Sequence, residues 1–236
     1  MPPRGPLVPM DPEAVVCTHP ELVISGEVVL DPGCVYEHRF VIEESDTSLD
    51  CNGARIRPAN PDHPAVVVKG QIDNVTVENC YCIGGRGINV RGPPREEDES
   101  HQELRDRSPA NIVVRNVYSA QSRNCGVYFH HHTVGAVLQD SIVEDNFRVG
   151  IYFGAESQGH TVRNCLIRGN GYTFEDGTVE TGWHRREGLA VDASSMNVIE
   201  DNHFDDNAFG GVFLYKNCWE HAAYKPNSWQ RIQHSS

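Results

Sequence analysis

The stretch GVYFHHHTVGAVLQDSIVEDNFRVGIYFGA, residues 126–155, decides the fold. It opens and closes on one unit, a glycine followed by alternating apolar residues, as in Val127-x-Phe129 and Ile151-x-Phe153. Alternation with a period of two is typical of a β-strand rather than a helix. A polar corner, LQDSIV (138–143), lies between the two strands, so strand and corner together recur after 24 residues.

The same unit recurs along the chain, which indicates a repeat protein. Its strands are GINVRG (87–92), GVYFHH (126–131), GIYFGA (150–155), GLAVDA (188–193) and GVFLYK (211–216). A corner precedes each strand: VENCYC (77–82), VRNVYS (114–119), LQDSIV (138–143), VRNCLI (162–167) and IEDNHF (199–204). The strand glycines are spaced by 39, 24, 38 and 23 residues, so a period near 24 carries two insertions of about 15 residues.

Short strands, glycine turns and Asn corners at this period predict a parallel solenoid with two or three strands per coil. Stacked coils pair the backbone groups of each strand with those of its neighbours. An Asn at the same bend of successive coils can bond to the next Asn, and Asn tolerates a left-handed bend. We therefore expect an inward-pointing ladder of Asn79, Asn116, Asp140, Asn164 and Asp201.

These repeats resemble the right-handed parallel β-helix of the pectin-lyase-like superfamily, a repeat type that polysaccharide lyases, mannuronan epimerases and copper-site periplasmic proteins share. The segment SDTSLDCNGARI (45–56) resembles the opening coil of such proteins, and the resemblance covers roughly residues 40–220. It implies an all-β, right-handed parallel β-helix of about five to seven coils. The fold hosts many activities. The sequence lacks the epimerases' Asp-Pro-His-Asp motif and the polygalacturonases' paired-Asp pattern, so neither activity carries over residue by residue.

The repeats also predict the domain organisation. Residues 1–39 are expected to form an N-terminal extension or cap, and residues 40–236 the β-helix, with insertions at 92–110 and 171–187. The first insertion is dense in charge and is expected to form a solvated loop or a short helix without a chemical role. No closing element is apparent after the fifth strand, so we expect a β-helix truncated at its C-terminal end. An open end exposes strand edges and could support self-association.

The eight cysteines leave two interpretations open. A bridge among Cys17, Cys34 and Cys51 could pin an N-terminal flap, or the cysteines could be buried free thiols. Cys80 and Cys82 form C-x-C without a matching second pair, which is weak evidence for zinc.

Composition excludes several classes of protein. The chain has 20 Lys+Arg against 33 Asp+Glu, a net charge of −13, which argues against a nucleic-acid partner. Charged residues are only 22%, which excludes a highly charged disordered chain. No run of about 18 apolar residues occurs, so no membrane-spanning helix is expected. The opening MPPRGPLVPM is not a signal peptide as it stands, so a secreted or periplasmic location is implied by the resemblance and the even cysteine count alone.

The strands also predict one outward face. Residues one and three positions after each glycine are apolar in every copy and form the core columns. Residues two and four positions after it must point outward: Asn89/Arg91, Tyr128/His130, Tyr152/Gly154, Ala190/Asp192 and Phe213/Tyr215. Aromatic rings beside charged groups in a long groove suit a polysaccharide. The alternative is a stabilising aromatic ladder with solvated charges.

The second insertion ends in Trp183-His184-Arg185-Arg186-Glu187, which leads into the strand of Asp192 and could wall the same groove. The alternative is an ordinary surface loop. His130 and His132 could share one face, but two histidines without a third ligand are weak evidence for zinc or copper, so no metal is assigned. The one cofactor left open is calcium, bound by Asp176, Glu180 or Asp192, although no fixed-spacing loop supports it.

Three functions remain in competition. The first is a polysaccharide lyase acting on a uronic-acid polymer by β-elimination. It needs a base at C5, a cation on the carboxylate and an acid at the leaving oxygen. The candidates are Lys216 or His130 as base, Arg186 or Arg185 as cation, and Tyr152 or Tyr215 as acid.

The second is a glycoside hydrolase with paired carboxylates, Asp192 with Glu187 or Asp176. A C5-epimerase would use much the same groups as the lyase. The third is a non-catalytic carbohydrate-binding or structural β-helix, which needs only the groove, with Tyr128, Tyr215 and Arg91 among its contacts.

Overall fold

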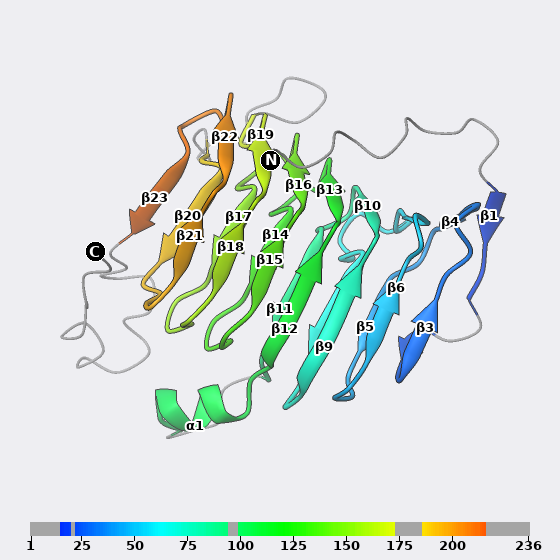
Figure 1. Ribbon diagram of the computed structural model, residues 1–236, viewed down its shortest axis with the longest axis horizontal. Helices are drawn as coiled ribbons and strands as arrows, with labels where there is room; N and C mark the ends of the chain where they lie inside the picture. The colour runs from blue at the N-terminus through cyan, green and yellow to red at the C-terminus, as the bar shows by residue number, and fades with distance from the viewer. Residues whose placement is uncertain (1–14, 20–21, 94–98, 173–185, 216–236) are drawn as a thin grey trace.

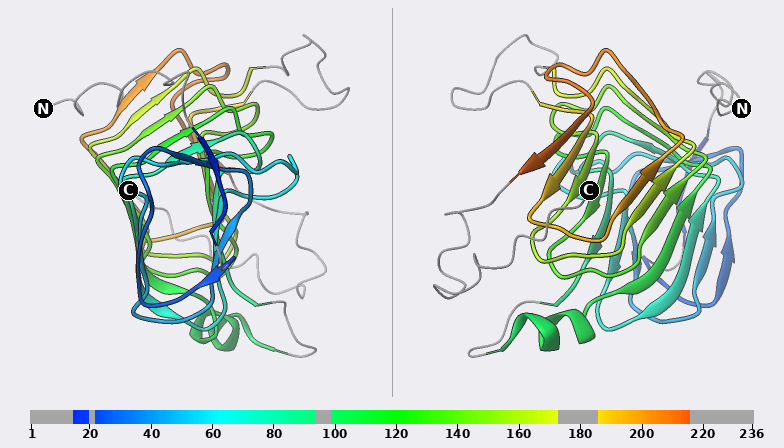
Figure 2. Two further views of the ribbon diagram at one scale, coloured as in Figure 1. Left: turned by 90° about the vertical axis from the view of Figure 1, so that its right-hand side faces the viewer. Right: turned by 60° about the vertical axis from the view of Figure 1, so that its left-hand side comes forward.

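The computed structural model describes residues 15–19, 22–93, 99–172 and 186–215. These residues form three sheets whose paired strands all run parallel, and the coils stack along one axis (Figures 1 and 2). Each coil that is described in full contributes one strand to each sheet, so the chain is a parallel β-helix, as the repeat predicts.

Sheet A consists of β1 (Val15–Cys17), β4 (Cys34–Tyr36), β7 (Arg55–Ile56), β10 (Tyr81–Ile83), β13 (Tyr118–Ala120), β16 (Ile142–Glu144), β19 (Leu166–Arg168) and β22 (His203–Asp205). Sheet B consists of β2 (Val23–Ile24), β5 (Phe40–Ile42), β8 (Val66–Lys69), β11 (Ile88–Arg91), β14 (Val127–Phe129), β17 (Ile151–Phe153), β20 (Leu189–Asp192) and β23 (Val212–Tyr215). Sheet C consists of β3 (Glu27–Val29), β6 (Ser48–Asp50), β9 (Asp73–Glu78), β12 (Ala110–Arg115), β15 (Val137–Gln139), β18 (Thr161–Arg163) and β21 (Val198–Glu200).

The glycine-led strands are β11, β14, β17, β20 and β23, consecutive neighbours in sheet B. Their register aligns Ile88, Val127, Ile151, Leu189 and Val212. The predicted core columns are buried in β11 to β20, where Phe129 stacks on Phe153 with ring centroids 5.8 Å apart. Val212 and Leu214 of β23 are exposed.

The N-terminal strands join the same sheets as the repeats. β1 pairs with β4, β2 with β5 and β3 with β6. Residues 15–19 and 22–39, which belong to the expected extension or cap, therefore contribute the first strands of the stack.

The predicted Asn ladder forms but faces outward, so its inward direction was wrong. Asn79, Asn116 and Asn164 have φ near +50°, and the side chain of Asn116 donates to that of Asn79 at 2.6 Å. Asn116 is nonetheless exposed. The inward ladder is another set: Asn146 donates to Asn170, and Asn170 to Asn207, each at 2.9 Å.

Both interpretations of the cysteines hold in part. Disulfides join Cys17 to Cys34 and Cys51 to Cys80, each linking neighbouring coils. Cys82, Cys125 and Cys165 are buried free thiols, and burial raises the pKa of the Cys82 thiol to about 12. Cys218 lies outside the described residues.

The first insertion contains α1 (His101–Asp106), a short helix at the lower edge of the stack in Figure 1. Ser100 caps it: its hydroxyl accepts from the Glu103 N–H at 3.2 Å, and the Glu103 carboxylate accepts from the Ser100 N–H at 2.8 Å. Leu104 is buried, which anchors the helix. No helix in the described ranges is long and apolar enough to cross a membrane.

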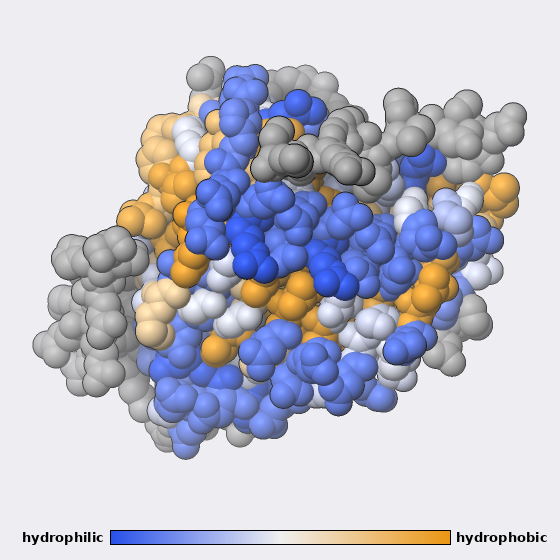
Figure 3. All heavy atoms as spheres, viewed as in Figure 1, coloured by the Kyte–Doolittle hydropathy of each residue, from blue (hydrophilic) through white to orange (hydrophobic). Residues whose placement is uncertain are grey.

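The outer surface is mostly hydrophilic on the face shown in Figure 3, with apolar patches at the two ends of the stack and smaller ones across its middle. At one end Val15, Val16 and Val29 are exposed, and at the other Phe209 and Leu214. Self-association through such an end stays a prediction.

Candidate active-site cleft

The outward columns of sheet B follow the predicted register. Asn89 pairs with Tyr128, Tyr128 with Tyr152, and Tyr152 with Ala190. In the next column Arg91 pairs with Lys69, and Asp192 with Tyr215. Side chains from coils far apart in sequence therefore lie side by side, because parallel strands stack about 4.8 Å apart.

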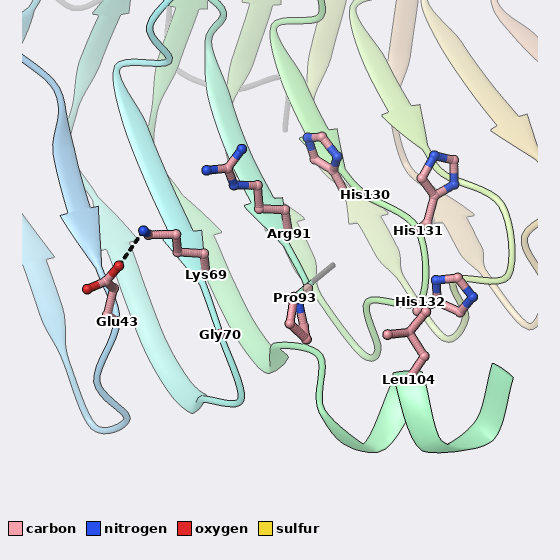
Figure 4. A pocket seen from close by; sticks show the side chains of 10 residues that line it. Glu43, Lys69, Gly70, Arg91, Pro93, Leu104, His130, His131 and His132 are labelled. Carbon is pink, nitrogen blue, oxygen red and sulfur yellow. Dashed lines mark ion pairs between the residues drawn. The ribbon is translucent and has the colours of Figure 1, made fainter. Parts of the chain in front are cut away.

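A cleft of about 710 Å³ opens on this face, lined by Glu43, Lys69, Gly70, Arg91, Gly92, Pro93, Leu104, His130, His131 and His132. Figure 4 shows Lys69, Arg91 and His130 on successive strands, with Pro93 and Leu104 on the side of α1. Lys69 forms an ion pair with Glu43, whereas Arg91 is exposed. Arg91 is therefore the exposed cation of the described cleft lining, on a chain of negative net charge.

His130 lies at the end of β14, and its backbone N–H donates to the Val90 carbonyl at 2.8 Å. Its imidazole stacks on Tyr128, with ring centroids 3.5 Å apart and planes tilted by 20°. The Nε2 atom is buried and has no hydrogen-bond partner. Burial, helped by His131 and Arg91, lowers the pKa of His130 to about 3, so the imidazole is neutral at neutral pH.

The first insertion walls the cleft, a role that the sequence did not predict. Leu104 of α1 lines it, and His101 of α1 stacks on His132 with an Nδ1–Nε2 distance of 3.0 Å. His132 is buried and lies at a φ of 65°. All three consecutive histidines line the cleft. Of the three, only His130 continues the outward-facing column of sheet B, two residues after Tyr128.

A tyrosine cluster continues the face beyond His130. Tyr128 meets Tyr152 edge to face, with ring centroids 5.0 Å apart. The Tyr152 hydroxyl donates to Asp192 Oδ2. Burial, this hydrogen bond and the charge of Asp192 raise the pKa of Tyr152 well above its usual range. Asp192 is only 4% exposed, so its carboxylate is shielded from solvent while it accepts the hydrogen bond from Tyr152.

The residues at the end of the second insertion lie beside this cluster. Glu187 is fully buried, so it is not part of an exposed wall. Burial together with Glu187 raises the pKa of Tyr215 to about 12, with Arg186 acting in the opposite direction. Arg186 is half-buried, and the Phe209 N–H donates to its backbone carbonyl at 3.0 Å. Arg186, Glu187 and Tyr215 are thus brought together, apart from the cleft-lining residues.

Several predicted residues lie outside the described ranges: Lys216, Trp183, His184, Arg185, Asp176 and Glu180. Among the residues that are described, no three His, Cys, Asp or Glu side chains are grouped closely enough to hold a metal ion. The sequence also missed Lys69. Its strand, VVVK, has no leading glycine, so only its pairing with Arg91 reveals it.

The comparison with protein-family models agrees with this architecture. No curated protein matches the chain. Among solved structures, the A-module of the mannuronan C-5 epimerase AlgE4 from Azotobacter vinelandii matches at 15% identity with a TM-score of 0.48, covering 80% of this chain. The chain spans about 60% of the length of that structure. The family model described as a right-handed β-helix region matches residues 41–222, and the chain therefore belongs to the right-handed β-helix family.

Proposed function

We propose that the chain is a carbohydrate-active protein, a lyase that cleaves a uronic-acid-containing polysaccharide by β-elimination in the cleft on sheet B. One observation carries the proposal: Arg91 and His130 line the same cleft, and Tyr128, on the same strand face, stacks on His130. A cation, a neutral imidazole and a phenol are the three groups that the reaction needs.

Substrate binding follows from the charges of the cleft. The carboxylate of a uronate residue would pair with Arg91, whose planar guanidinium suits two carboxylate oxygens. Lys69, one strand away, would take the next carboxylate along the polymer by exchanging its ion pair with Glu43 for one with the substrate. Local attraction in the cleft thus offsets the repulsion expected from a net charge of −13.

The proton transfers follow from the two rings. The His130 imidazole takes the C5 proton, and the C5–H electrons form the C4=C5 double bond as the C4–O4 bond breaks. Tyr128 donates its proton to the leaving O4, since burial raises its pKa and keeps it protonated. A base of low pKa is weak; burial is the main cause of the low pKa of His130, and a bound carboxylate would offset only the smaller contribution of Arg91. Tyr152, the earlier candidate acid, is instead committed to Asp192.

The disulfides Cys17–Cys34 and Cys51–Cys80 support a secreted or periplasmic location, because such bonds persist in oxidising compartments. A polymeric uronate would be met there. Calcium dependence stays a prediction, tested by adding a chelator to the assay below.

The test is product analysis after incubation with polygalacturonate, alginate and a neutral glucan. We expect ultraviolet absorbance from unsaturated ends with one of the acidic polymers only. Reducing ends without absorbance would indicate a hydrolase, inverted uronates without cleavage an epimerase, and retention without turnover a binding protein. Each of these outcomes overturns the lyase.

Two substitutions test the assigned groups. We expect His130→Gln and Arg91→Ala each to lower turnover by about a hundredfold or more. Arg115→Ala is the matched control, because Arg115 is an exposed arginine on sheet C, paired with Glu78 and remote from the cleft lining. Unchanged turnover in both cleft variants would contradict the assignment even if the chain is a lyase.

A further inference from the structure

A continuous line of side-chain contacts runs from Asp192 to the cleft. Asp192 accepts a hydrogen bond from the Tyr152 hydroxyl, Tyr152 meets Tyr128 edge to face, and Tyr128 stacks on His130. Three neighbouring strands, β20, β17 and β14, contribute Asp192, Tyr152 and Tyr128, and His130 follows directly after β14. The line thus joins a buried carboxylate to the imidazole that faces the cleft.

Each contact fixes a ring. The Tyr152 ring is held at its hydroxyl by Asp192, and Ala190, which pairs with Tyr152, has a side chain too small to block the path to Asp192. Both tyrosines pack on the small buried cluster of Cys125, Val149 and Ala190. An edge-to-face contact sets the relative orientation of two rings, because ring faces and edges carry opposite partial charges.

His130 depends on such support. β14 ends at Phe129, so His130 lies beyond the strand that would hold it. Its Nε2 has no hydrogen-bond partner, so no hydrogen bond at that atom sets the plane of the ring. The close stack on Tyr128 supplies a restraint from the ring face.

We propose that Asp192 is a positioning residue, which holds the His130 imidazole in its cleft-facing orientation through Tyr152 and Tyr128. The sequence had suggested Asp192 as a catalytic carboxylate, but its burial and its bond to Tyr152 favour this indirect role. The kinetic consequence rests on the proposed function, whereas the orientation of His130 does not.

The primary test is therefore made without substrate, by NMR of the histidine rings in the full chain. The resonances of His130 are assigned by their loss in His130→Gln. Stacking on Tyr128 should shift its ring protons upfield, and Asp192→Ala and Tyr152→Phe should each reduce that shift. Asp192→Asn keeps an oxygen that accepts from Tyr152 and should restore it.

Tyr118→Phe is the matched control, because Tyr118 donates to a carboxylate, Glu144, on sheet A. It should leave the His130 resonances unchanged. Unmoved His130 resonances in both Asp192→Ala and Tyr152→Phe would overturn the proposal, and so would an equal shift in Tyr118→Phe.

Kinetics supply the second arm. If the chain cleaves a polyuronate, Asp192→Ala should lower kcat by about tenfold to a hundredfold with KM little changed, because a misplaced base affects the reaction rather than binding. Asp192→Asn should recover most of it. No cleavage by the unmodified protein contradicts the proposed function alone, since the NMR result stands independently.

Discussion

His160 shows how one buried residue ties the stability of the coil stack to pH. It is fully buried, and its Nδ1 accepts from the Ala136 N–H at 3.1 Å. Phe129 and Phe153 each lie 5.0 Å from its ring. Burial lowers the pKa of His160 from 6.5 to about 3. Between these values the unfolded chain binds the extra proton, so the free energy of unfolding must fall as pH drops below about 6.5.

We predict that His160→Asn flattens this pH dependence. Asn can accept from the Ala136 N–H, as Asn197 accepts from the His160 N–H at 3.0 Å on the next coil. Each buried histidine of this kind adds up to about 1.4 kcal/mol per pH unit to the fall in the free energy of unfolding. We expect the slope of the free energy of unfolding against pH, measured by denaturant unfolding between about pH 4 and 6, to be smaller by that amount in the variant. The exposed His203→Asn is the control, and an unchanged slope in His160→Asn would contradict the prediction.

At the scale of elements, the strands could be predicted and the directions of their polar side chains could not. A glycine followed by alternating apolar residues specifies both the strand and its buried face, so Tyr128, Tyr152 and Asp192 fell on the expected side. Corner residues lack that alternation. Asn116 and Asn146 are equally polar, yet only the stack of neighbouring coils determines that Asn146 points inward.

The cleft wall was missed for a related reason. α1 is short and charged, and one buried side chain, Leu104, gives no helical period from which burial could be inferred. Glu187 is the converse case, since a carboxylate at the end of a charged loop gives no sign that it is fully buried.

We predict that α1 depends on its cap. A helix of six residues is marginal by itself, so the reciprocal bonds of Ser100 and Glu103 should matter. Ser100→Ala should destabilise it by about 1 kcal/mol, which accelerates amide exchange about fivefold. Hydrogen exchange over residues 99–108 measures this, with β9 in the same sample as reference. Equal exchange in variant and parent would show that Leu104, rather than the cap, holds the helix.

At the scale of the whole molecule, two electrostatic effects of opposite sign act on an acidic polymer. The net charge of −13 repels it over long distances, whereas Arg91 attracts it at contact. Salt screens charges beyond about 10 Å at 0.1 M and affects close pairs less. Association should therefore become faster as salt rises, while dissociation also becomes faster because the contact pairs weaken.

This prediction can be measured by stopped flow with a fluorescent oligouronate and the His130→Gln variant, which should bind while turning over about a hundredfold more slowly. Replacing Arg91 with Ala in that background should mainly accelerate dissociation, since it removes a contact pair but changes the net charge by one unit. Arg115→Ala makes the same change in net charge on sheet C and should leave dissociation unaltered. An association rate that falls with salt would mean that the field at the cleft mouth is attractive at long range, so that local cations outweigh the charge of the whole molecule.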